Sequence, residues 1–417
     1  MRILFLTDYW FPNMTANTIC VRNISEELLK QHNQVYVCAY DGKNAKDEQD
    51  GIRFSFVKPS LARRLLRAAQ NAKNNSEAHI LSTLGKLMNR TRRALLLPFY
   101  PITSFSVPFR WLAKANDIIR EHGIDTVVSV VAPEESLYAG YLIKKSNPSI
   151  NWIVYYIDAG TNILPGTSFE QAKKGLQNKA VRWENRILKE AEKIVVMEGH
   201  YPYYLKTLND TNRRKLYSAN VPLLRIKREN ACLSYRNNND VQKWVYTGSI
   251  NGIFYDPKPL CEFFSTYCQD HDAELHLYGP SDHKEYLMKA QKKCSRIVWH
   301  GPVSHEDALN AQEEADVLVY FKCGRLDSVS GKLFEYLVMR KPVVYMGLRD
   351  DINAKQLEKY RRGLILNSND SIPKQVSKAD EFFAYDGATG IVTIEEIEAA
   401  YYSSLPSTTA RLFLTNN

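Results

Sequence analysis

Glycine is missing from the start of this chain, and its absence there excludes one common nucleotide site. The first of the 19 glycines in the 417 residues is Gly42, so no G-x-G-x-x-G fingerprint follows the first apolar run, Arg2–Thr7. A dinucleotide-dependent dehydrogenase carries that fingerprint directly after its first strand. The pair Gly331-Lys332 makes no P-loop either, because Leu333 stands where a Ser or Thr must bind Mg²⁺.

Metal-binding and disulfide motifs are also lacking. The seven cysteines form no C-x-x-C pair and the nine histidines form no H-x-x-x-H pair, so a zinc site has little support. A chain of this length buries a sizeable core without a disulfide framework. We therefore interpret the cysteines as reduced thiols of a cytoplasmic protein, and we expect no metal site.

Long hydrophobic runs are absent too. The apolar opening Met1–Leu6 is followed closely by Asp8 and is too short for a signal peptide. The longest weakly polar stretch, 94–109, contains three prolines and is shorter than the about 20 residues that a membrane-spanning helix needs. We expect a cytoplasmic protein with no transmembrane helix.

The positive charge is concentrated in one segment. Residues 61–120 hold eleven Lys or Arg and only two acids, which equals the net charge of +9 of the whole chain. Such a segment binds an acidic partner: an anionic lipid surface, a nucleic acid or a phosphorylated substrate. An apolar, proline-broken stretch, Leu95–Pro101, follows Arg90, Arg92 and Arg93, which favours peripheral docking on the inner face of a membrane.

Two other partners for this segment were considered. A soluble acidic acceptor is the alternative to the membrane, and a basic exposed face with no partner is the plainer interpretation. A nucleic acid is disfavoured, because the segment has few aromatic residues among its charges and no known nucleic-acid motif.

Strand-like and helix-like patterns alternate along most of the chain. Short apolar runs such as Thr126–Val131 alternate with segments of helical spacing such as Thr18–His32. The alternation lapses in the polar stretch 227–240 and then restarts. Two βαβ series joined by a linker predict an α/β protein with two Rossmann-like, doubly wound parallel-sheet domains, 1–222 and 243–393. We expect the ligand site at the carboxyl ends of the strands, in a cleft between the domains.

The strongest local signal is the segment 327–337, which follows an apolar strand, Val317–Phe321, and opens a helix. Ser328 or Ser330 can cap that helix, and Gly331 allows the backbone to approach a ligand closely. The free N–H groups at the helix start, together with Lys332, form a site for a phosphate.

Two acids bracket this helix start. Glu335 lies about one turn into the helix, where a carboxylate can accept two hydrogen bonds from a ribose diol. Asp327 lies in the preceding loop, within reach of a second sugar. The pattern fits a nucleoside diphosphate sugar. In the plainer alternative, Glu335 is a surface acid and Ser330 only a cap.

At these residues the sequence resembles the retaining glycosyltransferases of family 4, of the type found in bacterial polysaccharide biosynthesis, which have the GT-B fold. The resemblance rests on the acids Asp327 and Glu335, on the helix segment 330–337 and on the following strand 341–344. Four upstream segments resemble the family's successive strand ends: 246–249, 277–279, 300–303 and 315–319. The resemblance covers nearly the whole chain, and it is specific in 244–347 and weak in 1–240.

The resemblance implies that a sugar moves from a nucleoside diphosphate sugar to a glycan acceptor, which we expect to be lipid-linked, with retention of configuration and without metal or cofactor. It implies donor binding in the C-terminal domain and acceptor binding in the N-terminal domain. It further implies a C-terminal helix, roughly 394–403, that crosses back, so that 394–417 completes the N-terminal domain.

The resemblance and the residue pattern together give the expected site. The expected catalytic residues are Asp327 and Lys332. The expected donor-binding residues are Gly248, Ser249, Tyr278, Gly279, His300, Gly301, Val303, Ser330, Gly331, Leu333 and Glu335. The expected acceptor-side residues are Thr15, Ala16, Asn17 and Asp158.

Three alternatives stay open at this point. Within the same fold, an inverting transferase would need a general base in the N-terminal domain, where Ala132–Glu135 occupies the strand end that carries a His in the family. A nucleotide-sugar epimerase is the second. The third alternative is not an enzyme but a basic nucleic-acid-binding protein. Ser249 stands where the family often has an Arg, and Lys258 is the candidate for its second phosphate-binding lysine.

Overall fold

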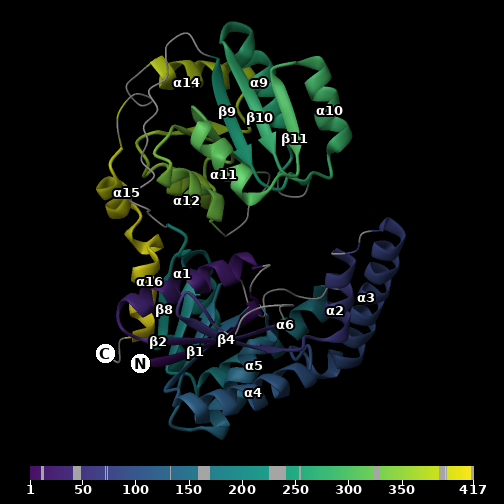
Figure 1. Ribbon diagram of the computed structural model, residues 1–417, viewed down its shortest axis with the longest axis vertical. Coiled ribbons are helices and arrows are strands. Elements are labelled where there is room, and N and C mark those ends of the chain that lie inside the picture. The colour runs from purple at the N-terminus through teal and green to yellow at the C-terminus, as the bar shows by residue number, and fades with distance from the viewer. Residues whose placement is uncertain are drawn as a thin grey trace. The chain divides into compact units, whose positions relative to one another are not determined.

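The structure, a computed structural model, describes residues 1–10, 14–40, 48–70, 72, 74–131, 133–157, 170–224, 241–252, 255–322, 329–384, 390 and 392–414. The chain divides into two compact units. The first unit consists of Met1–Pro222 and Pro406–Asn417, and the second of Leu223–Leu405. Each unit is built around its own β-sheet (Figure 1).

The first unit contains an eight-stranded sheet in the order β3-β4-β2-β1-β5-β6-β7-β8. Its strands are β1 (Arg2–Tyr9), β2 (Gln34–Tyr40), β3 (Glu48–Gln49), β4 (Ile52–Val57), β5 (Thr126–Val131), β6 (Asn151–Tyr156), β7 (Lys193–Met197) and β8 (Leu216–Ala219). All pairs are parallel except β3 with β4. The order reverses between β1 and β5, and such a reversal is where ligands bind in open α/β sheets.

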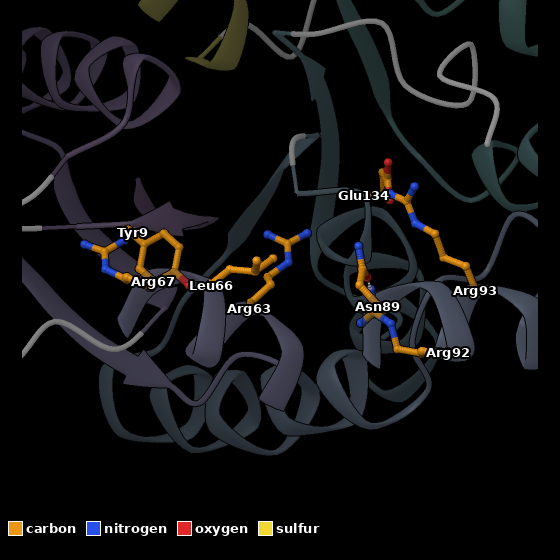
Figure 2. A pocket seen from close by; sticks show the side chains of 8 residues that line it. All are labelled: Tyr9, Arg63, Leu66, Arg67, Asn89, Arg92, Arg93 and Glu134. Atoms are coloured by element: carbon orange, nitrogen blue, oxygen red, sulfur yellow. Dashed lines mark hydrogen bonds between the residues drawn. The ribbon is translucent and has the colours of Figure 1, made fainter. Parts of the chain in front are cut away.

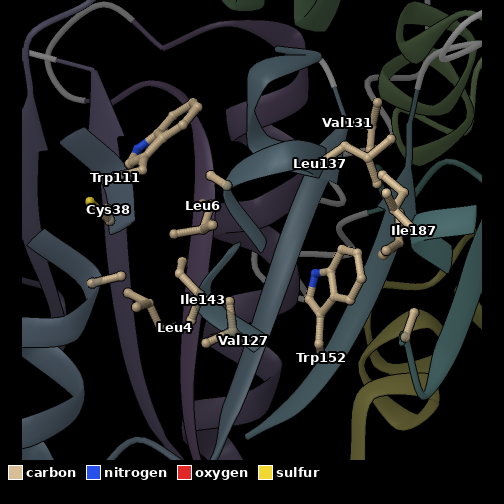
Figure 3. Close-up of a cluster of buried hydrophobic side chains, with 14 of the residues drawn as sticks. Leu4, Leu6, Cys38, Trp111, Val127, Val131, Leu137, Ile143, Trp152 and Ile187 are labelled. Atoms are coloured by element: carbon tan, nitrogen blue, oxygen red, sulfur yellow. The ribbon is translucent and has the colours of Figure 1, made fainter. Parts of the chain in front are cut away.

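Both faces of this sheet are covered. Along β1, Leu4 and Leu6 belong to one apolar cluster and Ile3 and Phe5 to another, because successive side chains of a strand point to opposite faces. The first cluster includes Trp111 and Trp152 and is drawn in Figure 3. Burial on both faces explains why the parallel strands are almost continuously apolar in sequence.

The helices of the first unit lie between and after these strands in the chain. They are α1 (Ala16–Lys30), α2 (Leu61–Gln70), α3 (Asn75–Leu96), η1 (Leu97–Phe99), α4 (Ser106–His122), α5 (Glu135–Ser146), α6 (Glu170–Leu188), η2 (Glu198–His200), α7 (Tyr201–Thr207), α8 (Asp210–Arg213) and α16 (Pro406–Leu414). The last of these, α16, packs against α1. Its Phe413 ring lies 5.9 Å from the ring of Phe5 and 5.4 Å from that of Tyr155.

The C-terminal return lies further along the chain than expected. The helix α15 (Ile394–Ala400) belongs to the second unit, where the hydroxyl of Tyr401 donates a hydrogen bond of 2.8 Å to the carbonyl of Gln356. The Tyr401 ring also contacts Phe334 at 6.1 Å. The prediction that 394–403 packs on the first domain is therefore wrong, and α16 is the helix that does so.

The basic segment 61–120 divides into two parts. Helices α2 and α3 pack closely on each other at Gly85, where an added Cβ would lie 2.9 Å from Leu66 (Figure 1). Helix α4 instead belongs to the core, because Trp111 is fully buried and its ring stacks on Tyr40 at 4.9 Å. The part of the basic segment that lies outside the core is thus limited to α2, α3 and the segment that follows them.

The second unit contains a six-stranded parallel sheet in the order β11-β10-β9-β12-β13-β14. Its strands are β9 (Gln242–Thr247), β10 (Ala273–Tyr278), β11 (Ile297–Gly301), β12 (Val317–Phe321), β13 (Val343–Gly347) and β14 (Gly363–Asn367). Its other helices are α9 (Lys258–Asp270), α10 (Lys284–Lys293), α11 (His305–Glu314), α12 (Gly331–Val338), α13 (Ile352–Leu357), α14 (Ile372–Ala384) and η3 (Tyr402–Ser404). The strand order reverses between β9 and β12, which confirms a second doubly wound sheet.

The described helices were also tested for membrane-spanning character. None of those in the described ranges combines the length and hydropathy required to cross a bilayer.

Candidate functional site

Three neighbouring strands of the second unit end in glycine. Gly248 follows β9, Gly279 follows β10, and Gly301 ends β11. Backbone hydrogen bonds join these ends, because the Gly248 N–H donates to Tyr278 at 2.7 Å and the Gly279 N–H donates to Gly301 at 2.7 Å. Three predicted donor-site glycines are therefore brought together at one edge of the sheet.

Two of these glycines have no substitute. Gly248 and Gly279 have φ angles of 142° and 139°, which residues with a side chain rarely adopt. A Cβ at Gly248 would lie 1.9 Å from the Nζ of Lys332, and a Cβ at Gly279 would lie 2.0 Å from the carbonyl oxygen of Gly248. The absence of a Cβ at Gly248 therefore lets the Lys332 side chain lie close to the backbone. Its absence at Gly279 lets the ends of β9 and β10 lie close together.

Helix α12 begins beside this glycine edge. Its N-cap, Ser330, makes no side-chain capping bond, and the Ser330 N–H donates to Asn353 at 2.9 Å. The Leu333 N–H donates to the Ser330 carbonyl at 3.2 Å. Because the Ser330 side chain makes no capping bond, the N–H groups of Gly331 and Lys332 have no partner among the described residues and can bind an anion. Gly331 and Lys332 therefore offer backbone donors and one ammonium beside the glycine edge, which are groups suited to a phosphate.

Lys332 is held against aromatic rings. Its Nζ donates a 3.0 Å hydrogen bond to the Tyr246 hydroxyl and lies 4.9 Å and 4.8 Å from the ring centres of Tyr246 and Tyr255. The Tyr246 hydroxyl in turn donates to the carbonyl of Ser249 at 2.8 Å. Burial lowers the pKa of Lys332 to about 8, against the opposing effect of Glu335. The negative charge that the described residues place near the ammonium is therefore too small to offset the effect of burial. This arrangement is expected of a group that binds an anion.

The remaining donor-side predictions differ in position. The side chain of Leu333 is fully buried and its N–H donates to the Ser330 carbonyl at 3.2 Å, whereas Glu335 is exposed. His300 is engaged elsewhere: its ring stacks on Tyr278 at 4.2 Å and its Nε2 lies 3.0 Å from the Nδ1 of His276. Burial lowers the pKa of both histidines.

Two further donor-side positions lie at the surface. Val303 is 37% exposed. Lys258 is exposed, and its Nζ lies 5.9 Å from the ring centre of Tyr286. Among the contacts of the described residues, nothing joins Lys258 to the glycine edge.

The predicted acceptor-side residues are structural in part. Thr15 is the N-cap of α1 and forms a capping box with Thr18, and Ala16 and Asn17 open that helix. Asp158 and Asp327 lie outside the described residues, so their predicted roles stay predictions.

A pocket that the sequence did not predict lies in the first unit, where β1 and β5 end. Its volume is about 330 Å³, and Figure 2 shows the side chains around it. Four arginines line it, Arg63 and Arg67 from α2 and Arg92 and Arg93 from α3. The other lining residues are Tyr9, Leu66, Asn89 and Glu134.

Charged groups of both signs meet around this pocket. The Arg67 guanidinium lies 3.6 Å from the ring centre of Tyr9, and Arg63 pairs at 3.0 Å with Glu135, whose side chain is only 1% exposed. Burial raises the pKa of Asp8, which lies near the end of β1, and burial followed by the Glu135 charge raises that of Glu134. A buried charge cluster of this kind at the end of a sheet is typical of functional sites.

The sequence contained a signal for this pocket. Asp8 directly follows an apolar run, and Glu134-Glu135 follow another whose strand pairs with it. Acids at the carboxyl ends of two central strands meet at one edge of a parallel sheet. The arginines could not be assigned to the same place, because the packing of α2 and α3 brings them there.

No protein-family model matches the chain, and no curated protein sequence matches it. Several solved structures do. The apo form of the lipopolysaccharide outer core galactosyltransferase WaaB aligns with a TM-score of 0.58 at 12% identity, over 99% of this chain and 98% of that one. A mutant of S. aureus TarM in complex with Fondaparinux, alpha-GlcNAc-glycerol and UDP aligns with a TM-score of 0.56 at 11% identity, over 99% and 100%.

A third solved structure is that of Anabaena Alr3699/HepE in complex with UDP and glucose. It aligns with a TM-score of 0.51 at 11% identity, over 99% of this chain and 95% of that one. At these identities the likeness concerns the fold. The chain has the GT-B fold, with two Rossmann-like α/β units, which confirms the predicted fold class.

Proposed function

We propose that this protein is a glycosyltransferase whose donor is a nucleoside diphosphate sugar. The observation that carries the proposal is the position of Lys332, at the uncapped start of α12 and against Gly248, where the strand order of the second sheet reverses. The GT-B fold supports it, since two of the similar solved structures hold UDP, one with glucose and one with alpha-GlcNAc-glycerol.

The chemistry follows from charge. Cleavage of the bond between the anomeric carbon and the phosphate oxygen leaves negative charge on the β-phosphate. Lys332 and the N–H groups at the start of α12 stabilise that charge, and losing one such donor typically costs about 10²–10³ in rate. These donors supply what a metal ion supplies elsewhere, so we propose metal-independent transfer.

Two finer assignments come from the resemblance to family 4. One is retention of anomeric configuration. The other is the contact of Asp327 with the donor sugar, which leaves the ribose to Glu335. NMR of the anomeric proton in the product distinguishes retention from inversion, and a product that is a free nucleotide sugar would instead favour an epimerase.

We also propose a lipid-linked acceptor and docking on an anionic membrane through α3. Apolar side chains on one side of α3 are well exposed, namely Ile80 at 58%, Leu84 at 46%, Leu87 at 58% and Leu95 at 73%. The exposed rings of Phe99, Phe105 and Phe109 follow in the chain. Single exposed apolar residues are normal, but a stripe of them indicates an interaction surface.

Basic residues accompany this apolar stripe. Lys86, Arg90 and Arg93 recur at helical spacing on another side of α3, and all three are exposed. Each Lys or Arg near an anionic surface contributes up to about 1 kcal/mol to binding. A helix with both surfaces can lie in the headgroup region without spanning the bilayer.

A binding panel tests the proposed function. Calorimetry with UDP, GDP, ADP and dTDP should show micromolar-range binding of at least one diphosphate, lost in Lys332→Ala. Lys292→Ala, which removes an exposed lysine of α10, is the matched control and should bind normally. If no diphosphate binds, or if both variants bind as the parent does, the donor-site assignment is wrong.

A further inference from the structure

The arginine pocket of the first unit is built as a ligand site rather than as a surface patch. It lies where β1 and β5, the two strands at the reversal of the sheet order, both end. Its volume of about 330 Å³ falls within the range of small-ligand sites. Lys332 and the glycine edge belong to the other unit.

The acids around the pocket do not use up its positive charge. Glu135 is the most buried of them, and its carboxylate bonds to Arg63 at 3.0 Å. The nearest approach of Arg92 to Glu135 is 4.0 Å, which is too long for a hydrogen bond. One buried carboxylate is therefore shared between two guanidinium groups and is hydrogen-bonded to one of them.

Arg92 is left with unused donors. Its Nη2 donates to Asn89 at 2.8 Å, but its Nε and Nη1 are buried and have no hydrogen-bond partner among the described residues. Leaving charged donors buried and unpaired is costly. The nearest acceptor is the buried Oε1 of Glu135, which also has no hydrogen-bond partner among the described residues and lies 4.0 Å from Nη1. An anion in the pocket would offer these donors an acceptor within hydrogen-bond distance.

Arg93 lies on the solvent-exposed side of the pocket. It is exposed, lies one residue after Arg92, and extends toward Glu134 in Figure 2. The Oδ1 of Asp8 is a further buried atom without a partner among the described residues. Because burial raises the pKa of both Asp8 and Glu134, these carboxyl groups repel an anion less than two exposed acids would.

We infer that this pocket binds a phosphate group carried by the acceptor. Arg92 and Arg93 make the direct contacts, and Arg63 neutralises Glu135 behind them. Several guanidinium groups converging from two helices fit a phosphate ester, which has about two negative charges and presents paired oxygens to each planar fork. The assignment of this phosphate to the acceptor rests on the proposed function, whereas the phosphate site itself rests on the pocket alone.

The test measures binding of inorganic phosphate by calorimetry in the presence of saturating UDP, so that the donor site is occupied. Arg93→Gln should weaken phosphate binding by about tenfold, and Arg92→Lys, which keeps the charge and removes the planar fork, should also weaken it. Arg64→Gln is the matched control, because Arg64 is an exposed arginine of α2 that does not line the pocket. Equal phosphate affinity in Arg93→Gln and Arg64→Gln would overturn the inference.

Failure of the inference differs from failure of the proposed function. If UDP binds with equal affinity to the parent and Arg93→Gln while phosphate shows no pocket-dependent binding, only the inference fails. If UDP does not bind at all, the donor assignment fails, and the phosphate titration is repeated without UDP on Lys332→Ala. A loss specific to Arg93→Gln in that background still supports the phosphate site.

Two sources of the phosphate are separated by their carrier. Vesicles of phosphatidylcholine with phosphatidic acid are compared with vesicles that carry phosphatidylglycerol, which lacks a terminal phosphate. A preference for phosphatidic acid that Arg93→Gln removes and Arg64→Gln keeps indicates a lipid-borne phosphate. If glucose 1-phosphate competes with inorganic phosphate and the protein shows no preference between the two kinds of vesicle, the phosphate is carried by a soluble phosphosugar. A lipid preference that both variants keep, with no competition by glucose 1-phosphate, would contradict the inference.

Discussion

Lys332 combines two demands that conflict. Its ammonium is buried against the rings of Tyr246 and Tyr255 and has no full counter-charge among the described residues around it. A buried cation lowers the stability of the folded chain, but in the proposed function it binds a diphosphate strongly because little water has to be removed. Stability is lowered at such sites in favour of function.

The first prediction concerns stability. Because burial lowers the pKa of Lys332 to about 8 in the folded state, the unfolded chain binds more protons between pH 8 and the ordinary value of 10.5. Stability therefore rises with pH in that window, and the full cost of the buried charge is present below pH 8. Lys332→Met should raise the free energy of unfolding at pH 7 by up to about 3 kcal/mol, as measured by urea denaturation, with loss of UDP binding. If Lys332→Met is less stable than the parent and still binds UDP, both the predicted gain in stability and the predicted loss of binding are wrong.

The second prediction concerns proton uptake. A diphosphate selects the charged form of Lys332, so at pH 9 the protein must take up a proton in order to bind. Affinity for UDP should fall by about tenfold from pH 7 to pH 9, with a binding enthalpy that depends on the ionisation enthalpy of the buffer at pH 9. The same titration with Lys332→Arg, which stays charged throughout, should show no such dependence. A buffer-independent enthalpy in the parent would contradict this assignment.

At the residue scale, the sequence predicted those site residues that are neighbours in the chain. The segment 330–335 was identified because helix start, glycine and lysine are adjacent in the chain. The rings of Tyr246 and Tyr255 could not be assigned, because they reach Lys332 only through the packing of β9 and the loop after it against α12. The occupation of His300 by Tyr278 and His276 likewise depends on the register of β10 against β11.

Helix α3 shows how one element can serve two surfaces. Asn89 and Arg92 face the pocket, whereas Leu84 and Leu87 are exposed on another side of the helix. Helix α2 lies close against α3 at Gly85, which fixes the rotation of α3 about its axis. This rotation decides which residues of α3 line the pocket and which are exposed on another side of the helix.

The third prediction tests the apolar side of α3. The double variant Leu84→Ser and Leu87→Ser removes apolar surface that is already exposed, so the folded state should keep its stability within about 0.5 kcal/mol. Flotation on vesicles of phosphatidylcholine with phosphatidylglycerol should fall at least several-fold. Met288→Ser on α10, a residue 56% exposed in the second unit, is the control. Equal flotation of all three proteins would refute docking through α3.

At the element scale, composition misplaced α4, and the family resemblance misplaced the helix that returns to the first unit. The charge of 61–120 predicted one surface segment, but α4 contains Val107, Trp111 and Ala115 at core positions, and these outweigh its basic residues. The apolar spacing of 394–403 correctly predicted a buried helix face but not the unit on which that face packs. Spacing indicates that a face is buried, whereas the partner depends on where the matching surface lies.

At the scale of the whole molecule, the chain begins and ends in the same unit. The first and last described helices of that unit, α1 and α16, pack on each other, and the amine of Lys193 donates a 3.0 Å hydrogen bond to the carbonyl of Leu412. The second unit is therefore an insertion in the first in terms of chain order. The sequence predicted two doubly wound sheets because their strands alternate regularly with helices, whereas the position of the return helix depended on tertiary packing.

The last prediction tests this closure of the first unit by its final helix. Phe413 is 1% exposed and contacts the rings of Phe5 and Tyr155. Phe413→Ala leaves a cavity under the sheet and should destabilise the first unit by about 3–5 kcal/mol. Hydrogen exchange followed by mass spectrometry should show faster exchange in peptides from β1 and β6 but not in those from β9 and β10. Phe109→Ala, at an exposed phenylalanine of α4, is the control and should leave both sheets unchanged. Faster exchange confined to β9 and β10 would instead mean that α16 stabilises the second unit.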